Sequence, residues 1–244
     1  MRGIVLAAGG GSRLRPLTDE LPKTLLPVDG DRTILELVIA NLAASKIEQI
    51  TVVSGHEASA IDAAVPELAR RYEVDIDVRF NPRFDLANNA YSLWTVRDHF
   101  ETGVLLVNGD TVHPVSVEER LLEARGSAPL LLACDTVKHL ADEEMKVSLD
   151  EHGRIQRISK RIDPVTASGE YIGVCVIEPE AAGPLVASLE RTFEADPGRW
   201  YEDGFQDFID AGGHVGAVPI GEVEWGEIDD HTDLERVRSF LCPS

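Results

Sequence analysis

Short apolar runs alternate with helical patterns over the first 110 residues of the chain, and this alternation limits the fold more than any other feature. The apolar runs predict strands at Arg2–Ala8, Gln49–Gly55, Asp75–Phe80 and Gly103–Asp110. The helices predicted between them are Thr33–Ser45, Glu57–Tyr72, which Pro66 could break or kink, and Asn88–His99. Neighbouring parallel strands need crossover connections, usually helices. We therefore expect an α/β fold with a mixed, mostly parallel sheet and helices on both faces.

The second half of the chain predicts more strands and fewer helices. The expected strands are Pro129–Asp135, Met145–Asp150, Gly153–Ser159, Glu170–Glu178 and His214–Pro219, with a hairpin turn at Asp150–Arg154. The expected helices are Pro179–Glu194, Glu202–Ala211 and Thr232–Leu241. We expect one domain over residues 1–244, in which residues 116–244 add a mixed sheet to residues 1–115.

The charge of the chain is strongly negative but unevenly placed. A formal net charge of −20 argues against nucleic acid and an anionic membrane surface as partners, because like charges repel. Residues 1–32 nevertheless hold five basic residues against four acidic ones. An anionic ligand would therefore be drawn to this N-terminal segment.

Export and membrane insertion are not predicted. The first apolar run is too short for a signal peptide, and no window approaches the roughly 18 apolar residues of a spanning helix. Three widely spaced cysteines, Cys134, Cys175 and Cys242, predict free thiols rather than disulfides or a metal site. We expect a cytoplasmic protein.

The segment LAAGGGSRLRPLTDELPKTLLPV, Leu6–Val28, follows the first predicted strand. Glycines at this position let the backbone turn tightly and bring its N–H groups against a ligand, most often phosphate. The segment is not a dinucleotide fingerprint, because Leu14 replaces the third glycine, nor a P-loop, because Pro22 precedes the lysine. A surface turn is the plainer alternative. Arg13 and Lys23 favour a triphosphate instead.

This segment closely resembles the signature of the sugar-phosphate nucleotidyltransferase superfamily, LAAGxGxRLxPLTxxxPKxLLPV. The resemblance implies a nucleotide-binding α/β fold of the glycosyltransferase-A type, with the nucleotide in the first half and the acceptor in the second. It also implies that Arg13 binds the leaving pyrophosphate and that Lys23 lies beside the reacting phosphates. The nucleotide contacts expected around the glycines are Leu6, Ala7, Ala8, Gly9, Gly11 and Ser12, with Gly55 after the second strand.

A triphosphate needs a divalent cation, and Mg²⁺ prefers carboxylate and substrate oxygens. Asp110 ends a predicted strand, where α/β sheets bind their ligands, although an aspartate in a turn is often only a cap. The second carboxylate is expected from WGEIDDHTDL, which offers Glu227, Asp229 and Asp230. Asp230 is the better N-cap for the closing helix. We therefore assign Asp110 and Asp229 to Mg²⁺ and keep Asp230 in reserve.

The same C-terminal motif, W-x-E-I-D, resembles the small cytidylyltransferases that activate phosphocholine, 2-aminoethylphosphonate or inositol phosphate. The sugar-1-phosphate enzymes more often read D-I-G-T-P there. The segment NPRFDLANNAYSLW, Asn81–Trp94, is similar to the same branch. Asn88, Asn89 and Ser92 are therefore candidates for hydrogen bonds to base or ribose, although Asn88 could equally cap the helix that follows.

Acceptor-binding candidates come from the second half. Glu143–Lys160 also resembles the cytidylyltransferase branch, with Lys160 matching the lysine that neutralises the acceptor phosphate and Lys146 as the weaker candidate. A solvated surface lysine is the alternative for Lys160. A cationic head group could be enclosed by aromatic and acidic side chains, namely Trp200, Tyr201, Glu202 and Trp225. These aromatic residues could instead pack in the core, and the acids could bind hydroxyls of a cyclitol or sugar.

The expected activity is Mg²⁺-dependent nucleotidyl transfer, with CTP favoured. A phosphate or phosphonate oxygen of a small acceptor attacks the α-phosphorus and pyrophosphate leaves. Because the nucleophile is already an anion, positioning and charge neutralisation replace a general base. The alternatives are a sugar-1-phosphate or cyclitol-phosphate nucleotidyltransferase with another nucleotide, a glycosyltransferase, or a non-catalytic nucleotide-binding protein. Asn108-Gly109-Asp110 lacks the Asp-x-Asp usual in glycosyltransferases. A homodimer is left open.

Overall fold

The computed structural model describes residues 1–241, so Cys242 lies outside the described residues. Cys134 and Cys175 are buried free thiols, as expected. No helix among the described residues is long and apolar enough to cross a bilayer.

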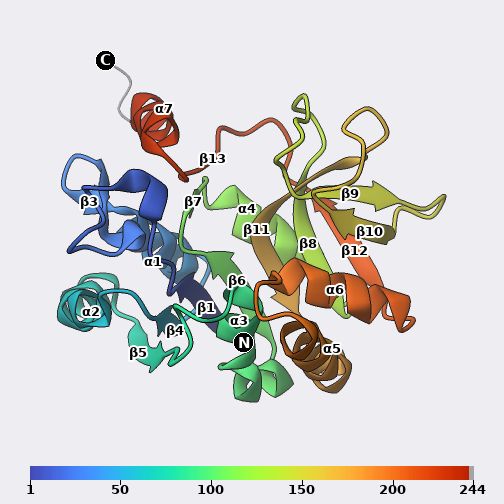
Figure 1. Cartoon of the computed structure of the whole chain (residues 1–244), viewed down its shortest axis with the longest axis horizontal. Coiled ribbons are helices and arrows are strands. Elements are labelled where there is room, and N and C mark those ends of the chain that lie inside the picture. The colour runs from blue at the N-terminus through green and yellow to red at the C-terminus, as the bar shows by residue number, and fades with distance from the viewer. Residues whose placement is uncertain (242–244) are drawn as a thin grey trace.

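Strand β1 (Arg2–Ala7) lies at the centre of a parallel sheet (Figure 1). It pairs in parallel with β4 (Gln49–Ser54) on one side and with β6 (Val104–Asn108) on the other. Strand β4 pairs in parallel with β5 (Asp75–Phe80). The predicted alternation of strands and helices in the first half is confirmed.

Strand β11 (Gly169–Ile177) is buried along its whole length and continues the sheet into the second half by pairing antiparallel with β6. Strands β8 (Leu130–Asp135) and β9 (Lys146–Leu149) both pair antiparallel with β11. Strand β10 (Ile155–Ser159) is antiparallel to β9, and β12 (Val215–Pro219) is parallel to β8. Within residues 1–241 the result is one nine-stranded sheet whose second half is mixed, as predicted.

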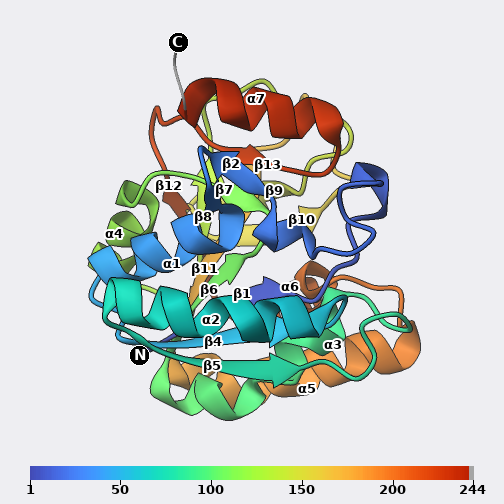
Figure 2. The same cartoon turned by 90° about the vertical axis from the view of Figure 1, so that its left-hand side faces the viewer.

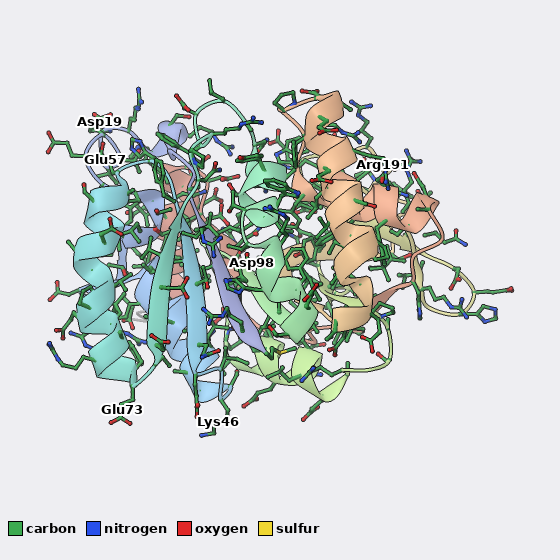
Figure 3. All side chains as sticks on the ribbon, turned by 90° about the horizontal axis from the view of Figure 1, so that it is seen from below. Asp19, Lys46, Glu57, Glu73, Asp98 and Arg191 are labelled. Carbon is green, nitrogen blue, oxygen red and sulfur yellow. The ribbon has the colours of Figure 1, made fainter. Side chains whose placement is uncertain are left out.

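Helices cover both faces of this sheet because successive strand residues point to opposite sides. On one face lie α1 (Ile34–Ala44), α2 (Ala58–Tyr72) and α4 (Ser116–Glu123). On the other lie α3 (Asn89–Trp94), α5 (Ala182–Ala195) and α6 (Tyr201–Asp210). Figure 2 shows α1 and α2 from the first side, and Figure 3 shows α2 and α5 at opposite sides of the strands.

The segment after β1 packs against the last helix, α7 (His231–Leu241). Two 3-10 turns, Ser12–Leu14 and Lys23–Leu25, bury Leu14 and Leu25, and a small hairpin follows from β2 (Pro27–Asp29) and β3 (Arg32–Thr33). Leu14 belongs to the same apolar cluster as side chains of α7. Two segments far apart in the chain are thereby brought together.

Several element boundaries differ from the sequence prediction. Helix α2 is not broken at Pro66, because this proline lies on the exposed side, where water can satisfy the carbonyl that lacks a partner. The predicted helix Asn88–His99 is two helices in the structure. Helix α3 ends at Trp94, with Thr95 as its C-cap, and a 3-10 helix, Arg97–Thr102, follows it. The predicted helix at Pro179 begins with a 3-10 turn, Pro179–Ala181, before α5.

Helix α4 and four very short strands were not predicted, and β2 and β3 are two of these strands. Helix α4 buries Val117 and Leu121, a spacing of four residues that could have indicated it. Strands β7 (Thr111–Val112) and β13 (Gly226–Glu227) have two residues each, too few for a periodic pattern. The predicted hairpin at Asp150–Arg154 is confirmed, with the Gly153 N–H donating to the Asp150 carbonyl.

Phe100→Ala should lower the free energy of unfolding by about 3–5 kcal/mol, because the ring is fully buried between the sheet and α5 and its removal leaves a cavity. Leu86→Ala, at a side chain that is 73% exposed, should change it by less than about 0.5 kcal/mol. Urea unfolding of both variants measures the difference. Equal losses would contradict the assignment of Phe100 to the core.

Candidate functional site

Strands β1 and β6 end at the same edge of the sheet, and the turn after β6 lies tightly against β1. The Gly109 N–H donates to the Leu6 carbonyl at 2.9 Å. A Cβ at Gly109 would lie 2.5 Å from that carbonyl oxygen and 2.6 Å from the Thr24 methyl group, so only glycine fits. This close approach holds the next residue, Asp110, beside the segment that carries Lys23.

A cavity of about 320 Å³ opens at this edge, between the two halves of the chain. Arg13, Asp110 and Asp229 line it, whereas Lys23 is not among its lining residues. Its wall from the first half includes six predicted nucleotide contacts, namely Leu6, Ala8, Gly9, Asn88, Asn89 and Ser92. Its wall from the second half includes three predicted acceptor contacts, namely Lys160, Trp200 and Glu202.

The ammonium of Lys23 bridges two carboxylates from distant parts of the chain. Its Nζ lies 2.9 Å from Asp110 Oδ2 and 3.1 Å from Asp229 Oδ1, and the lysine side chain is only 12% exposed. Arg13 adds a second cation, 2.8 Å from Asp229 Oδ2. Burial works to lower the pKa of Lys23, but the two carboxylates outweigh it and raise the pKa above its usual value. Burial opposes ionisation of Asp229 as well, yet Lys23 and Arg13 lower its pKa.

Glu227 joins Asp110 and Asp229, and one carboxylate oxygen from each lies within 4.8 Å of the others. Strand β13 brings it there, because Glu227 pairs with Thr111 and the Ile228 N–H donates to the Asp110 carbonyl at 2.9 Å. Desolvation within the cleft, followed by the charges of the two aspartates, raises the pKa of Glu227, although part of the residue remains exposed. The sequence prediction left Glu227 unassigned. Its E-x-D spacing was the available signal, since alternate residues of an extended segment share a face.

These three carboxylates fit a divalent cation. Asp110 Oδ1 is buried and has no hydrogen-bond partner within residues 1–241, so one ligand oxygen is available. A donor set of carboxylate oxygens alone suits Mg²⁺ or another hard cation. Asp230 is used differently: its Oδ1 accepts the N–H groups of Thr232 and Asp233 at 2.8 and 3.0 Å and caps α7, as the sequence indicated.

The asparagines on the nucleotide side of the cavity also have structural partners. Asn88 caps α3 and donates its Nδ2 to the Gly198 carbonyl at 3.0 Å. Asn89 Oδ1 accepts the Tyr201 N–H at 2.9 Å, which ties α3 to α6. Both side chains line the cavity, so capping and a ligand contact are compatible.

Four predicted nucleotide contacts lie outside the cavity wall. Ala7 is buried in β1, and Ser12 is exposed in the turn that follows. Gly11 has φ +56°, and a Cβ there would lie 3.1 Å from Lys23 Cβ, so it positions the lysine. A Cβ at Gly55 would lie 2.5 Å from Phe84 Cβ, which explains this glycine by packing.

Trp200 and Glu202 line the acceptor side of the cavity, whereas Tyr201 lies beneath it. Trp200 is 40% exposed, and the Lys160 Nζ lies 5.1 Å from the centroid of its ring. Burial raises the pKa of Glu202 to about 7. Tyr201 is fully buried and donates its hydroxyl hydrogen to Asn108 Oδ1 at 2.9 Å, so it packs rather than reaching the cavity.

The structure does not bring Lys146 and Trp225 into this cavity. Lys146 is fully buried, and its Nζ donates to the backbone carbonyls of Ala141, Asp142 and Glu144 at 2.7–3.1 Å. These hydrogen bonds hold the loop before β9 in a fixed conformation around the ammonium.

Trp225 lines a neighbouring cavity of about 820 Å³ that meets the first at Arg13, Lys160, Glu227 and Asp229. Its Nε1 donates to Asp135 Oδ2 at 2.7 Å, and the Lys138 Nζ lies 5.1 Å from its ring centroid. The position of Trp225 is therefore set by a polar network of the protein itself.

Lys23→Met should lower the free energy of unfolding at pH 7 by about 1–3 kcal/mol, less than for a fully buried ion pair because about a quarter of each aspartate side chain is exposed. The lowered pKa of Asp229 means that its stabilisation is present above the unfolded value of about 3.9 and is lost as pH falls through the folded value. In urea unfolding the loss should therefore be smaller at about pH 3 than at pH 7, with the decrease setting in below about pH 3.9.

Lys46→Met is the control for this experiment, because Lys46 is an exposed residue at the end of α1 (Figure 3). It should change the free energy of unfolding by less than about 0.5 kcal/mol at either pH. A loss in Lys23→Met that stayed constant with pH would show that the ion pairs do not cause it.

The nucleotidyl transferase family model matches residues 2–160. CMP-5'-(3-aminopropyl)phosphonate synthase from Streptomyces rubellomurinus is 31% identical over 253 aligned residues, which cover 100% of this chain and 39% of that protein. The 2-aminoethylphosphonate cytidylyltransferase of Lancefieldella rimae is 30% identical over 157 residues, 64% of this chain and 60% of that protein. This chain therefore spans less than two thirds of the length of both relatives.

Among solved structures, the inositol-1-phosphate CTP transferase from T. maritima matches with a TM-score of 0.82 and 24% identity, covering 98% of this chain and 95% of that one. This likeness confirms the expected fold, which nucleotidyltransferases share. Together with the match over residues 2–160, it leads to one conclusion: the chain belongs to the nucleotidyl transferase family.

Proposed function

We propose that this protein transfers the nucleotidyl group of CTP to a small phosphorylated alcohol or phosphonate. An acceptor oxygen attacks the α-phosphorus, the new P–O bond forms there, and the bond to pyrophosphate breaks. The observation that carries the proposal is a cavity lined by Arg13, Asp110 and Asp229, whose two carboxylates also bind the buried ammonium of Lys23. Such a cavity can hold a triphosphate and a metal ion together.

Each cation near the reacting centre has a separate task. Lys23 stabilises negative charge that gathers on the α-phosphate, and Arg13 binds the pyrophosphate that leaves. Lys160, on the acceptor wall, neutralises the acceptor phosphate so that two anions can approach. No general base is needed, because the attacking oxygen is already ionised.

Asp110, Glu227 and Asp229 are the residues that would hold Mg²⁺. When bound there, the ion would neutralise the triphosphate and polarise its P–O bonds. Removal of a carboxylate should therefore weaken both metal and nucleotide binding.

Two features support CTP and a small acceptor over the alternatives. The names of both curated relatives refer to cytidylyl products of aminoalkyl phosphonates, and the C-terminal motif W-x-E-I-D resembles the same branch. Asn88, Asn89 and Ser92 line the cavity and offer amide and hydroxyl groups to a base or ribose. Ser92 also accepts a hydrogen bond from Asn81 Nδ2 at 2.8 Å, so its hydroxyl is held in place.

Lys23→Ala and Asp110→Ala should each lower kcat by more than about a hundredfold, since one such charge contact contributes roughly 3–4 kcal/mol to the transition state. The far-ultraviolet circular dichroism spectrum should stay unchanged, because neither residue belongs to the apolar core. Steady-state pyrophosphate release measures the effect. Normal turnover of either variant would remove that residue from the mechanism.

Wild-type protein should release pyrophosphate fastest with CTP when CTP, UTP, ATP and GTP are compared with Mg²⁺ and an acceptor panel. The panel contains phosphocholine, 2-aminoethylphosphonate, inositol phosphate and glucose 1-phosphate. Omission of the divalent cation should abolish release. A purine triphosphate as the best donor would overturn the cytidylyl assignment. Nucleotide binding without release from any pair would favour a non-catalytic protein.

A further inference from the structure

Glu202 lines the cavity and has a buried acceptor atom without a partner among the described residues. The residue is 7% exposed in the first turn of α6, and its Oε2 is buried without a hydrogen-bond partner within residues 1–241. It lines both the 320 Å³ cavity and an adjoining one of about 540 Å³, which also share Met145, Lys160 and Trp200. A buried carboxylate oxygen without a donor is costly, so a ligand that brings a donor there gains affinity.

The neighbours of Glu202 along α6 do not supply this donor. The Asp203 carboxylate is itself an acceptor, for Arg199 at 3.1 Å and for the Trp200 N–H at 3.0 Å. The single hydroxyl hydrogen of Tyr201 is donated to Asn108 Oδ1 at 2.9 Å, and the Tyr171 hydroxyl lies 3.0 Å from the Tyr201 oxygen. The donor for Glu202 Oε2 therefore has to enter through the cavity.

Trp200 shows which kind of donor suits this position. Its exposed ring already carries the alkylammonium of Lys160, 5.1 Å from the ring centroid, in a cation–π contact. The same lysine also contributes positive charge toward Glu202. A lysine that turns to the acceptor phosphate leaves both the ring face and the carboxylate without a cation.

On the basis of the proposed function, we infer that the acceptor carries a primary ammonium, which lies over Trp200 and donates to Glu202 Oε2. The phosphate at one end of the acceptor draws Lys160 away from Trp200 and Glu202. The ammonium at the other end of the acceptor then replaces the positive charge that Lys160 had supplied there. A quaternary ammonium has no N–H and would leave the oxygen unpaired. A hydroxyl can donate but brings no charge. Glu202 is therefore the residue that selects among head groups.

Three acceptors that differ only at the head group test this inference: 2-aminoethyl phosphate, phosphocholine and 2-hydroxyethyl phosphate. With CTP and Mg²⁺, kcat/KM should be at least about tenfold higher for 2-aminoethyl phosphate than for the other two, because only its head group is both charged and a donor. Equal or higher values for either of the others would overturn the inference. Inositol phosphate or glucose 1-phosphate as a better acceptor would overturn it as well.

Glu202→Gln supplies the second arm, since it keeps the size of the side chain and removes its charge. It should lower kcat/KM for 2-aminoethyl phosphate at least about tenfold, mainly through KM, and change that for 2-hydroxyethyl phosphate less than about threefold. Glu194→Gln makes the same charge change on the exposed side of α5 and should alter neither value. Equal losses for all acceptors in Glu202→Gln would contradict selection by this carboxylate.

The two levels of the proposal fail in different ways. Absence of pyrophosphate release with every nucleotide and every acceptor would refute nucleotidyl transfer itself. Release that follows another order of head groups would refute only the role of Glu202 and leave the transfer reaction in place.

Discussion

The ammonium of Lys23, held between Asp110 and Asp229, is the interaction on which the arrangement of the cleft depends. It joins the segment after β1, the end of β6 and the segment before α7, which are far apart in the chain. Without this cation, three carboxylates crowded within 4.8 Å would repel one another in a poorly solvated place. The lysine therefore makes it possible to assemble a concentrated negative charge before any metal ion arrives.

Rigid backbone elements deliver each of these charges. Gly109 lets the end of β6 lie against β1, and the pairing of β13 with β7 places Glu227 on the same side as Asp229. Leu14 and its apolar neighbours hold the glycine segment against α7. Side chains mounted on strand ends and packed turns keep their positions better than those on free loops, which suits a reaction governed by positioning.

The sequence predicted the parts of the molecule that depend on local pattern. Strand and helix alternation gave the sheet, and one continuous motif identified Arg13 and Lys23, while Asp229 followed from a short motif far along the chain. Glu227 was not assigned, because the two-residue strand β13 is too short to be recognised as extended, and the E-x-D spacing indicates a shared face only in an extended segment. Lys146 was proposed for the acceptor, but its burial depends on a loop that folds around its ammonium.

The same limit applies to the aromatic residues of the second half. Trp200, Tyr201 and Trp225 have similar chemistry in the sequence, yet the structure exposes the first, buries the second and gives the third a partner in Asp135. These differences arise from how α6 packs on the sheet and from contacts across more than 80 residues. Composition and spacing contain no information on such contacts, so the residues of the acceptor wall could be named only as a group.

The pairing of β11 with β6 has a consequence for how substrates enter. Backbone bonds from Val174 to Ile177 fasten the two walls of the cleft to one another through the middle of the sheet. This continuous ladder resists a hinge at the boundary between the two walls. In the proposed reaction, shielding of the phosphates from bulk water would then depend on side chains at the rim of the cavity rather than on closure of the two walls.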